Sequence, residues 1–144
     1  MTRIKVSVIR AVALGFLLFC AGACDFLGPD GPKGPGDLFA TMVSPNGDEG
    51  SAVFELSGGV GLGTVSPVGG EVFYEHAGSS TRIAVVMDEP GEVRFQIRTE
   101  NVGHLPEVTV IQVADGENDL RTSLSGYKVE FTWEKDSSKK GFGG

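Results

Sequence analysis

The chain has 144 residues, and its 19 acidic residues outnumber its 12 basic ones, which gives a net charge of −7. This balance argues against nucleic acid as a partner, because affinity for nucleic acid comes largely from Lys and Arg at phosphates. Both cysteines, Cys20 and Cys24, lie near the start of the chain. The remainder therefore cannot hold a disulfide, a cysteine nucleophile or a thiolate metal site, and it is long enough for one domain with a real core.

The first segment of the chain has the layout of a secretory signal. Arg3, Lys5 and Arg10 precede an uncharged run over residues 11–19, and small residues follow at positions 21–23. This order is typical of a cleaved export signal. Two alternatives stay open: an ordinary cleaved signal with an incidental cysteine, and an uncleaved transmembrane helix. The apolar run is shorter than the about 20 residues that a membrane-spanning helix needs.

Residues 21–24, Ala-Gly-Ala-Cys, resemble the lipobox of bacterial lipoproteins, with Ala21 at the position where Leu is usual. The resemblance implies that the signal peptide 1–23 is removed and that Cys24 carries acyl chains. Two or more chains are needed for stable anchoring in a bilayer. The resemblance therefore predicts a lipid-anchored protein of the bacterial cell envelope, on the periplasmic or the surface side. Asp25 directly follows the cysteine, and the choice between inner and outer membrane stays open.

A Gly/Pro-rich stretch over residues 28–37 follows the cysteine, and its triplets begin Gly-Pro. Such a composition favours an extended polyproline-type spacer. The predicted tether therefore covers residues 24–37. Without the signal, nine basic and 19 acidic residues remain, a net charge near −10. This charge argues against docking of the domain itself onto anionic lipid.

From residue 38 onward the pattern predicts strands. Apolar residues alternate with polar ones, and this period gathers side chains on one face of a strand but scatters them around a helix. Turn signals recur about every 8 to 12 residues, which is typical of a two-sheet sandwich or a barrel. We expect strand segments at 38–43, 52–56, 60–67, 71–76, 82–87, 93–99, 107–114 and 127–134. The tail over 135–144 is rich in Ser, Lys and Gly, and we expect it to be disordered.

Three of these segments carry specific expectations. The apolar run Arg82 to Met87 predicts a strand buried on both faces, and Asp88-Glu89-Pro90-Gly91 predicts a turn after it. In the last segment Trp133 shares a face with Tyr127, Val129 and Phe131. This favours core packing for Trp133, with a place at the rim as the alternative.

The segments SAVFELSGG, STRIAVVM and GEVRFQIRTENVGHLPEVTVIQVADGENDL resemble the cohesin-like or carbohydrate-binding-like β-sandwiches of bacterial surface proteins. The resemblance covers residues 38–134 and implies an all-β, antiparallel, immunoglobulin-like (cohesin-like) sandwich. The expected class is thus a sandwich of eight or nine strands, preceded by a signal helix and a Gly/Pro linker. Cohesins bind dockerin modules, but no set of residues here matches a dockerin-binding face.

The residues that could carry chemistry are few. His76 and His104 do not have a metal-ligand spacing, and we expect them in water at a strand end and in a loop. Three acids, Asp115, Glu117 and Asp119, share one loop and are the weak calcium candidates, because calcium prefers oxygen ligands. A solvated turn is the alternative for these three, and also for the similar acidic segments 46–49 and 88–89. No catalytic residue and no cofactor is predicted.

These observations together predict a non-catalytic protein rather than an enzyme. The expected function is a membrane-anchored envelope lipoprotein that presents a β-sandwich as a binding or structural module. Its expected partners are the membrane, through the lipid on Cys24, and an envelope protein or polysaccharide. The alternative is a carbohydrate- or calcium-binding adhesion module, for which Phe73, Tyr74, Phe131 and Trp133 are the aromatic candidates.

Overall fold

The computed structural model describes residues 31–59 and 61–135. The predicted signal peptide, Cys24 and the tail after residue 135 lie outside the described residues. Within the described ranges no helix is long and apolar enough to cross a membrane. The strands there are β1 (Gly36–Val43), β2 (Glu49–Ser57), β3 (Val65–Val68), β4 (Gly70–Ala77), β5 (Ser80–Gly91), β6 (Arg94–Thr99), β7 (Glu107–Ala114) and β8 (Lys128–Lys135).

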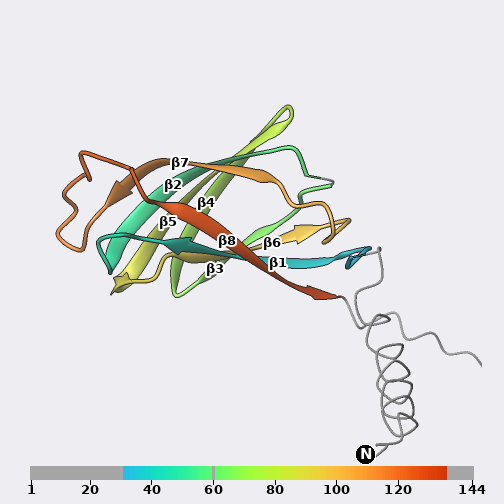
Figure 1. Cartoon of the computed structure of the whole chain (residues 1–144), viewed down its shortest axis with the longest axis horizontal. Helices are drawn as coiled ribbons and strands as arrows, with labels where there is room; N and C mark the ends of the chain where they lie inside the picture. Colours follow the sequence, from blue (N-terminus) through green and yellow to red (C-terminus); the bar gives the residue numbers. More distant parts are fainter. Residues whose placement is uncertain (1–30, 60, 136–144) are drawn as a thin grey trace, which may run out of the picture. The chain divides into compact units, whose positions relative to one another are not determined.

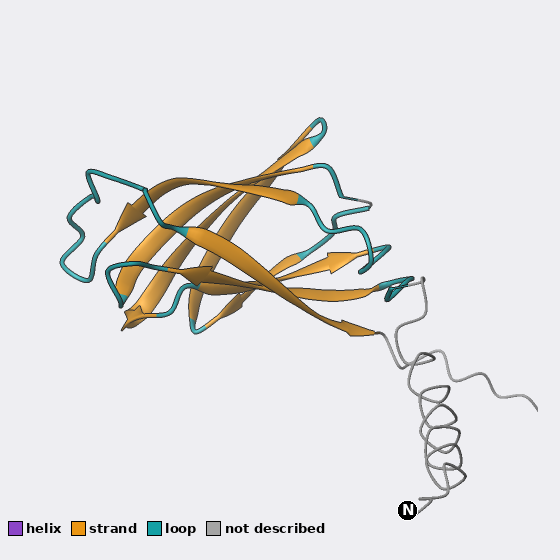
Figure 2. Cartoon of the chain, in the orientation of Figure 1, coloured by secondary structure: helices purple, strands orange, loops and turns teal. Residues whose placement is uncertain are grey.

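The eight described strands form two four-stranded sheets, with strand orders β3-β6-β1-β8 and β4-β5-β2-β7 (Figures 1 and 2). Every pairing in both sheets is antiparallel. The sheets lie face to face as two layers (Figure 1). The all-β, antiparallel sandwich that the sequence predicts is therefore confirmed.

The core lies between the sheets because alternate side chains of the strands point toward the facing sheet, and the buried ones are mostly apolar. On β1 the burial alternates strictly along the strand, and Leu38 is fully buried. Phe54 of β2 and Phe95 of β6 meet from opposite sheets, with ring centroids 5.3 Å apart at a tilt of 45°. Tilted aromatic pairs of this kind add to the free energy gained by burying their area. This pair therefore links the two layers at the centre of the core.

Strands β4 and β5 form a hairpin that is closed by the two residues Gly78 and Ser79, since Ala77 pairs with Ser80. Gly78 has a φ of +60°. A two-residue hairpin loop that matches the twist of its strands needs a positive φ at its first position, where glycine carries no steric penalty. The glycine at this position therefore sets the register of the whole hairpin.

The sandwich has two distinct ends. At one, which we call the terminal pole, β1 begins and β8 ends, and Gly36 pairs with Lys135 there. At the other lie the connections 44–48, 92–93 and 115–127, together with the end of β5 (Figure 1). We call this end the acidic pole because it carries Asp48, Asp88, Glu89, Glu92, Asp115, Glu117 and Asp119.

The predictions for the fifth strand are wrong in two respects. Its outer face is not buried, since Arg82 is exposed and Val86 is 44% exposed. A two-layer sandwich covers each sheet on one side only, so an apolar run does not require burial on both faces. The strand also continues through the predicted turn to Gly91. Its ladder with β2 shifts register there, because Glu49 pairs with Gly91 and Ser51 pairs with Val86.

The ends of the domain also differ from expectation. Trp133 is 47% exposed, so the prediction that it packs in the core is wrong. It does point to the same side of β8 as Phe131, which packs against the core, but its position close to the end of the strand leaves its ring at the rim. At the other end, β1 begins at Gly36, inside the segment that the sequence assigns to the tether.

Candidate functional site

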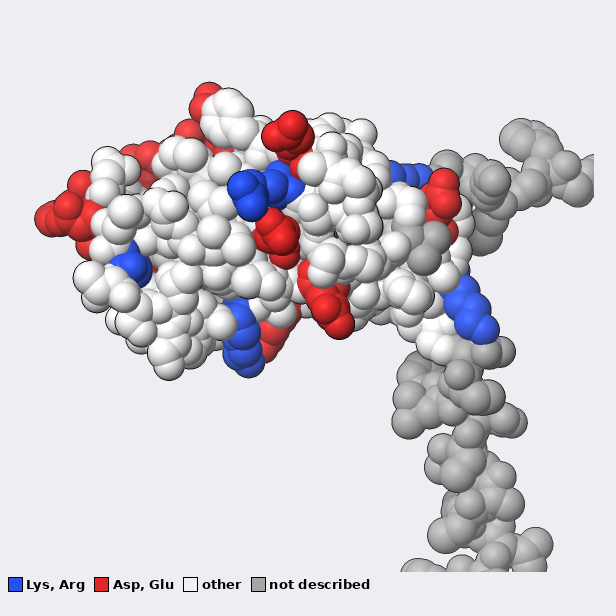
Figure 3. All heavy atoms as spheres, turned by 90° about the horizontal axis from the view of Figure 1, so that it is seen from above, with Lys and Arg blue, Asp and Glu red and all other residues white. Residues whose placement is uncertain are grey.

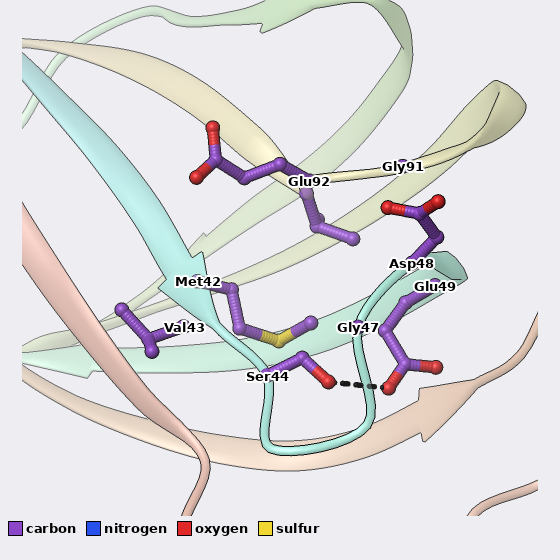
Figure 4. Close-up of a pocket in the computed structure, with 9 residues that line it drawn as sticks. Met42, Val43, Ser44, Gly47, Asp48, Glu49, Gly91 and Glu92 are labelled. Carbon is purple, nitrogen blue, oxygen red and sulfur yellow. Dashed lines mark hydrogen bonds between the residues drawn. The ribbon is translucent and has the colours of Figure 1, made fainter.

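A hollow of about 260 Å³ opens at the acidic pole (Figure 4). The end of β1, the turn that follows it and the connection from β5 to β6 surround it. Two of its walls carry carboxylates, from Asp48 and Glu49 on one side and from Glu92 on the other. The residues that line it are Met42, Val43, Ser44, Gly47, Asp48, Glu49, Gly91, Glu92 and Val93.

Glu49 is fully buried at the edge of this hollow, and its carboxylate accepts hydrogen bonds from three donors. One oxygen, Oε1, accepts from the Ser44 hydroxyl at 2.7 Å and from the Tyr127 hydroxyl at 2.5 Å. The other, Oε2, accepts from Nε of Arg121 at 3.0 Å and forms an ion pair with it. A buried charge is tolerated when it is paired and fully hydrogen-bonded. We call Glu49, Ser44, Tyr127 and Arg121 the Glu49 network.

The network fastens the connection from β7 to β8 onto the start of β2. Arg121 and Tyr127 both belong to this connection, whereas Glu49 begins β2. The Asn46 amide donates to the Tyr127 hydroxyl at 2.8 Å, which adds the turn after β1. The hydrogen bond that Arg121 donates to Glu49 raises the pKa of Arg121 above its ordinary value. The carboxylate of Glu49 is thus occupied by structural donors.

Asp115 shapes the other end of the same connection. Its Oδ1 accepts the backbone N–H groups of Glu117 and Asp119, at 2.9 and 3.0 Å. Its Oδ2 lies 3.7 Å from Nη1 of Arg121. The two backbone hydrogen bonds, from Asp119 first and then from Glu117, lower the pKa of Asp115 below the ordinary value, and the charge of Arg121 adds to this.

The acids of this pole do not converge. In Figure 4 the carboxylate of Glu49 points toward Ser44, while those of Asp48 and Glu92 point in other directions. Among the described residues, no group of three or more His, Cys, Asp or Glu side chains is placed to hold a metal ion. Of the calcium candidates, Asp115 closes its own turn, and Glu117 and Asp119 are exposed. The arrangement supports a structural use of Asp115.

The lowered pKa of Asp115 makes the stability of the fold depend on pH. An aspartate titrates near 3.9 in an unfolded chain, and its pKa is lower in this fold, so its contribution is present above about pH 4 and is lost as the pH falls further. We expect Asp115→Asn to flatten the decline of stability below pH 4. Its amide oxygen still accepts the two N–H groups, but its charge no longer titrates. Urea unfolding at pH 7, 4 and 3 measures this. If the stability of the variant declined as much as that of the unmodified chain, Asp115 would not be the source of this pH dependence.

The two histidines are placed as follows. His76 is exposed near the end of β4, its Nδ1 lies 2.8 Å from the Thr81 hydroxyl, and its ring meets Tyr74 edge-on at 5.3 Å. His104 is exposed in the connection from β6 to β7, and its backbone N–H donates to the backbone carbonyl of Asn101. His76 thus lies at a strand end and His104 in a loop, as the sequence predicts.

The residue that sequence reasoning missed is Glu49. The segment Asn46-Gly47-Asp48-Glu49 is typical of a solvated turn, and the solvated alternative is wrong for its last residue, which is 0% exposed. Two of the three partners of Glu49, Arg121 and Tyr127, lie 72 and 78 residues away in the sequence, so no local pattern indicates its burial. The alternation of β2 gives no signal for Glu49: Ala52, Phe54 and Leu56 are buried, so the same period places Gly50 inward and Glu49 outward. The register shift between Glu49 and Ser51 turns Glu49 inward instead.

Comparisons with protein-family models, with curated proteins and with solved structures find no match for this chain. The class that the fold defines is therefore a two-sheet antiparallel β-sandwich whose buried glutamate network closes one pole. The resemblances to bacterial lipoproteins and to cohesin-like modules stay predictions from the sequence.

Proposed function

We propose that this chain is a non-catalytic lipoprotein of the bacterial cell envelope. In this proposal acyl chains on Cys24 hold it in the membrane, the Gly/Pro-rich spacer sets its reach, and the sandwich is a binding or structural module. Confinement to a membrane raises the effective concentration of such a module for partners there. The observation that carries the proposal is Cys24 itself, which directly follows three small residues and the apolar run.

The architecture of the sandwich is compatible with this role. The chain enters β1 at the terminal pole, so the connections of the acidic pole lie at the opposite end of the module (Figure 1). Its carboxylate network is saturated by structural donors, which supports a presenting module over a catalytic one.

Replacement of the anchoring thiol tests the proposal. We expect the Cys24→Ser variant to move from the membrane fraction to the soluble fraction, because a serine hydroxyl cannot form the acyl-bearing thioether. Fractionation and intact-mass measurement read this out. The unmodified chain should have the mass of residues 24–144 plus acyl chains.

Cys20→Ser is the matched control, since it makes the same chemical change four positions earlier. This variant should stay in the membrane fraction with an unchanged mass. An unmodified Cys24, or a Cys24→Ser variant that still sediments with membranes, would refute the anchor.

A further inference from the structure

The edge strands of the two sheets are protected to different degrees. An edge strand presents unpaired N–H and C=O groups, and proteins usually shield it by shortness, proline, bulges or charges, lysine above all. β3 has four residues and includes Pro67. β7 has a bulge at Ile111. Gln112 and Val110, on either side of it, pair with Val53 and Phe54, which are adjacent on β2. β8 carries Lys128, Glu130 and Glu134 on its outer side.

Strand β4 has less protection than the other three. It runs for eight residues, Gly70–Ala77, at the edge of its sheet, and it pairs with β5 without a register break. It contains no proline and no lysine. Most of its side chains are exposed, including Phe73 at 59% and Tyr74 at 41%. A long, regular and exposed edge is a template for pairing with another strand.

The outer face of β4 carries a specific order of side chains. Glu71, Phe73 and Glu75 alternate along it, so the aromatic ring lies between two carboxylates. Glu75 lies opposite Arg82, but the Arg82 guanidinium bonds to Glu55 on the far side at 2.9 Å. Figure 3 looks onto this face of the sheet, where a band of charged side chains crosses a mostly uncharged surface. Among the described residues neither Glu71 nor Glu75 forms an ion pair.

A shallow hollow lies on the outer face of the same sheet, over Ala84 of β5 and between Phe73 and Val53. It measures about 250 Å³ and is lined by Val53, Phe73, Tyr74, Glu75, Arg82 and Ala84. Partners that add a strand to a sheet gain affinity from backbone hydrogen bonds and specificity from pockets for alternate side chains. Here the hollow lies on the far side of Phe73 from the free edge, so the exposed ring of Phe73 is the apolar contact that remains for an added strand.

We propose that the edge of β4 binds an extended segment of a basic partner protein, in which two Lys or Arg residues flank an apolar residue at alternate positions. The two cations would lie opposite Glu71 and Glu75, and the apolar side chain would lie on Phe73. Oppositely charged cross-strand pairs stabilise a sheet, and a cation near Phe73 also gains from the face of its ring. The negative net charge of the chain favours encounter with a basic partner.

A second copy of this chain fits the same edge poorly. If two β4 strands paired antiparallel about Phe73, Glu71 of one copy would lie opposite Glu75 of the other. If they paired parallel in register, each glutamate would lie beside its own counterpart. Like charges directly opposite each other destabilise a sheet. The two glutamates therefore act against self-pairing while they favour a basic strand.

The inference rests on the proposed binding function but not on the lipid anchor, so membrane fractionation and the following titration can fail independently. The probe is a capped peptide with the sequence Thr-Lys-Thr-Val-Thr-Lys-Thr, titrated into the full chain and followed by NMR of the backbone amides. We expect shifts along β4 and at Ala84. We expect the double variant Glu71→Lys/Glu75→Lys to bind the peptide about tenfold more weakly.

The matched control is Glu89→Lys/Glu117→Lys, which makes the same change of charge at the acidic pole and should bind as the unmodified chain does. A peptide with Glu in place of Lys should bind the double β4 variant better than the unmodified chain. Absence of binding, equal binding of the Lys and Glu peptides, or shifts away from β4 would overturn the proposal. Dimers that form at rising concentration and disappear in the double β4 variant would overturn it in favour of a second copy.

Discussion

Phe54→Ala is expected to lower the free energy of unfolding by about 3–5 kcal/mol, the usual cost of truncating a buried phenylalanine. Phe54 is 0% exposed, and its ring packs against Phe95 from the facing sheet. The substitution leaves a cavity between two sheets that are each held by their own ladders, so the cavity cannot collapse fully. Urea unfolding followed by the fluorescence of Trp133, the single tryptophan, measures the change.

Phe73→Ala is the matched control for this prediction. It removes the same side chain from the same sheet, but from the outer face, where the ring is 59% exposed. We expect a change within about 1 kcal/mol, as for most surface substitutions. Equal losses from the two variants would mean that the core does not lie between the sheets as described.

Glu49→Ala is expected to destabilise the fold by about 3 kcal/mol, because it removes one partner of a buried pair. It leaves Ser44, Tyr127 and Arg121 without their shared acceptor. Glu49→Gln keeps the size and one acceptor oxygen but loses the charge, so a smaller loss of about 1–2 kcal/mol is expected. Hydrogen exchange should become faster in the connection from β7 to β8, beginning at Arg121, whose N–H bonds to the Val113 carbonyl.

Two comparisons make this result specific. Glu117→Ala removes an exposed carboxylate from the same pole and should change stability by less than about 0.5 kcal/mol. A double-mutant cycle of Glu49→Ala with Tyr127→Phe should give a coupling energy of 0.5 kcal/mol or more, since the residues share a hydrogen bond. Additive losses would show that the two residues act independently.

The sequence predicted those features that depend on local alternation. The period of two over the predicted strand 93–99 places Val93, Phe95, Ile97 and Thr99 on one face, and all four are buried. The bounds Glu107–Ala114 of β7 were predicted as they are observed. In the first segment the period of two fixes which side chains share a face. In β7 the bulge at Ile111 breaks that period, so only the bounds of the strand followed from the sequence.

Features that depend on distant partners could not be predicted in this way. The burial of Glu49 requires Arg121 and Tyr127, which belong to the connection from β7 to β8 and follow it by 72 and 78 residues. Val86 is exposed because no third layer covers the outer face of its sheet, and the sequence of one strand does not reveal how many layers the fold has. The path of β5 through Pro90 depends on its pairing of Gly91 with Glu49, although proline locally favours a turn.

The pairing of Gly36 with Lys135 brings the first residue of β1 and the last residue of β8 side by side. Because these two ends of the domain lie next to each other, the domain can be inserted into a surface loop of a host protein without separating the two sides of that loop. Fluorescent or affinity tags grafted at either joint would likewise sit together, leaving the opposite end and both flanks of the module unobstructed for mapping contacts in living cells.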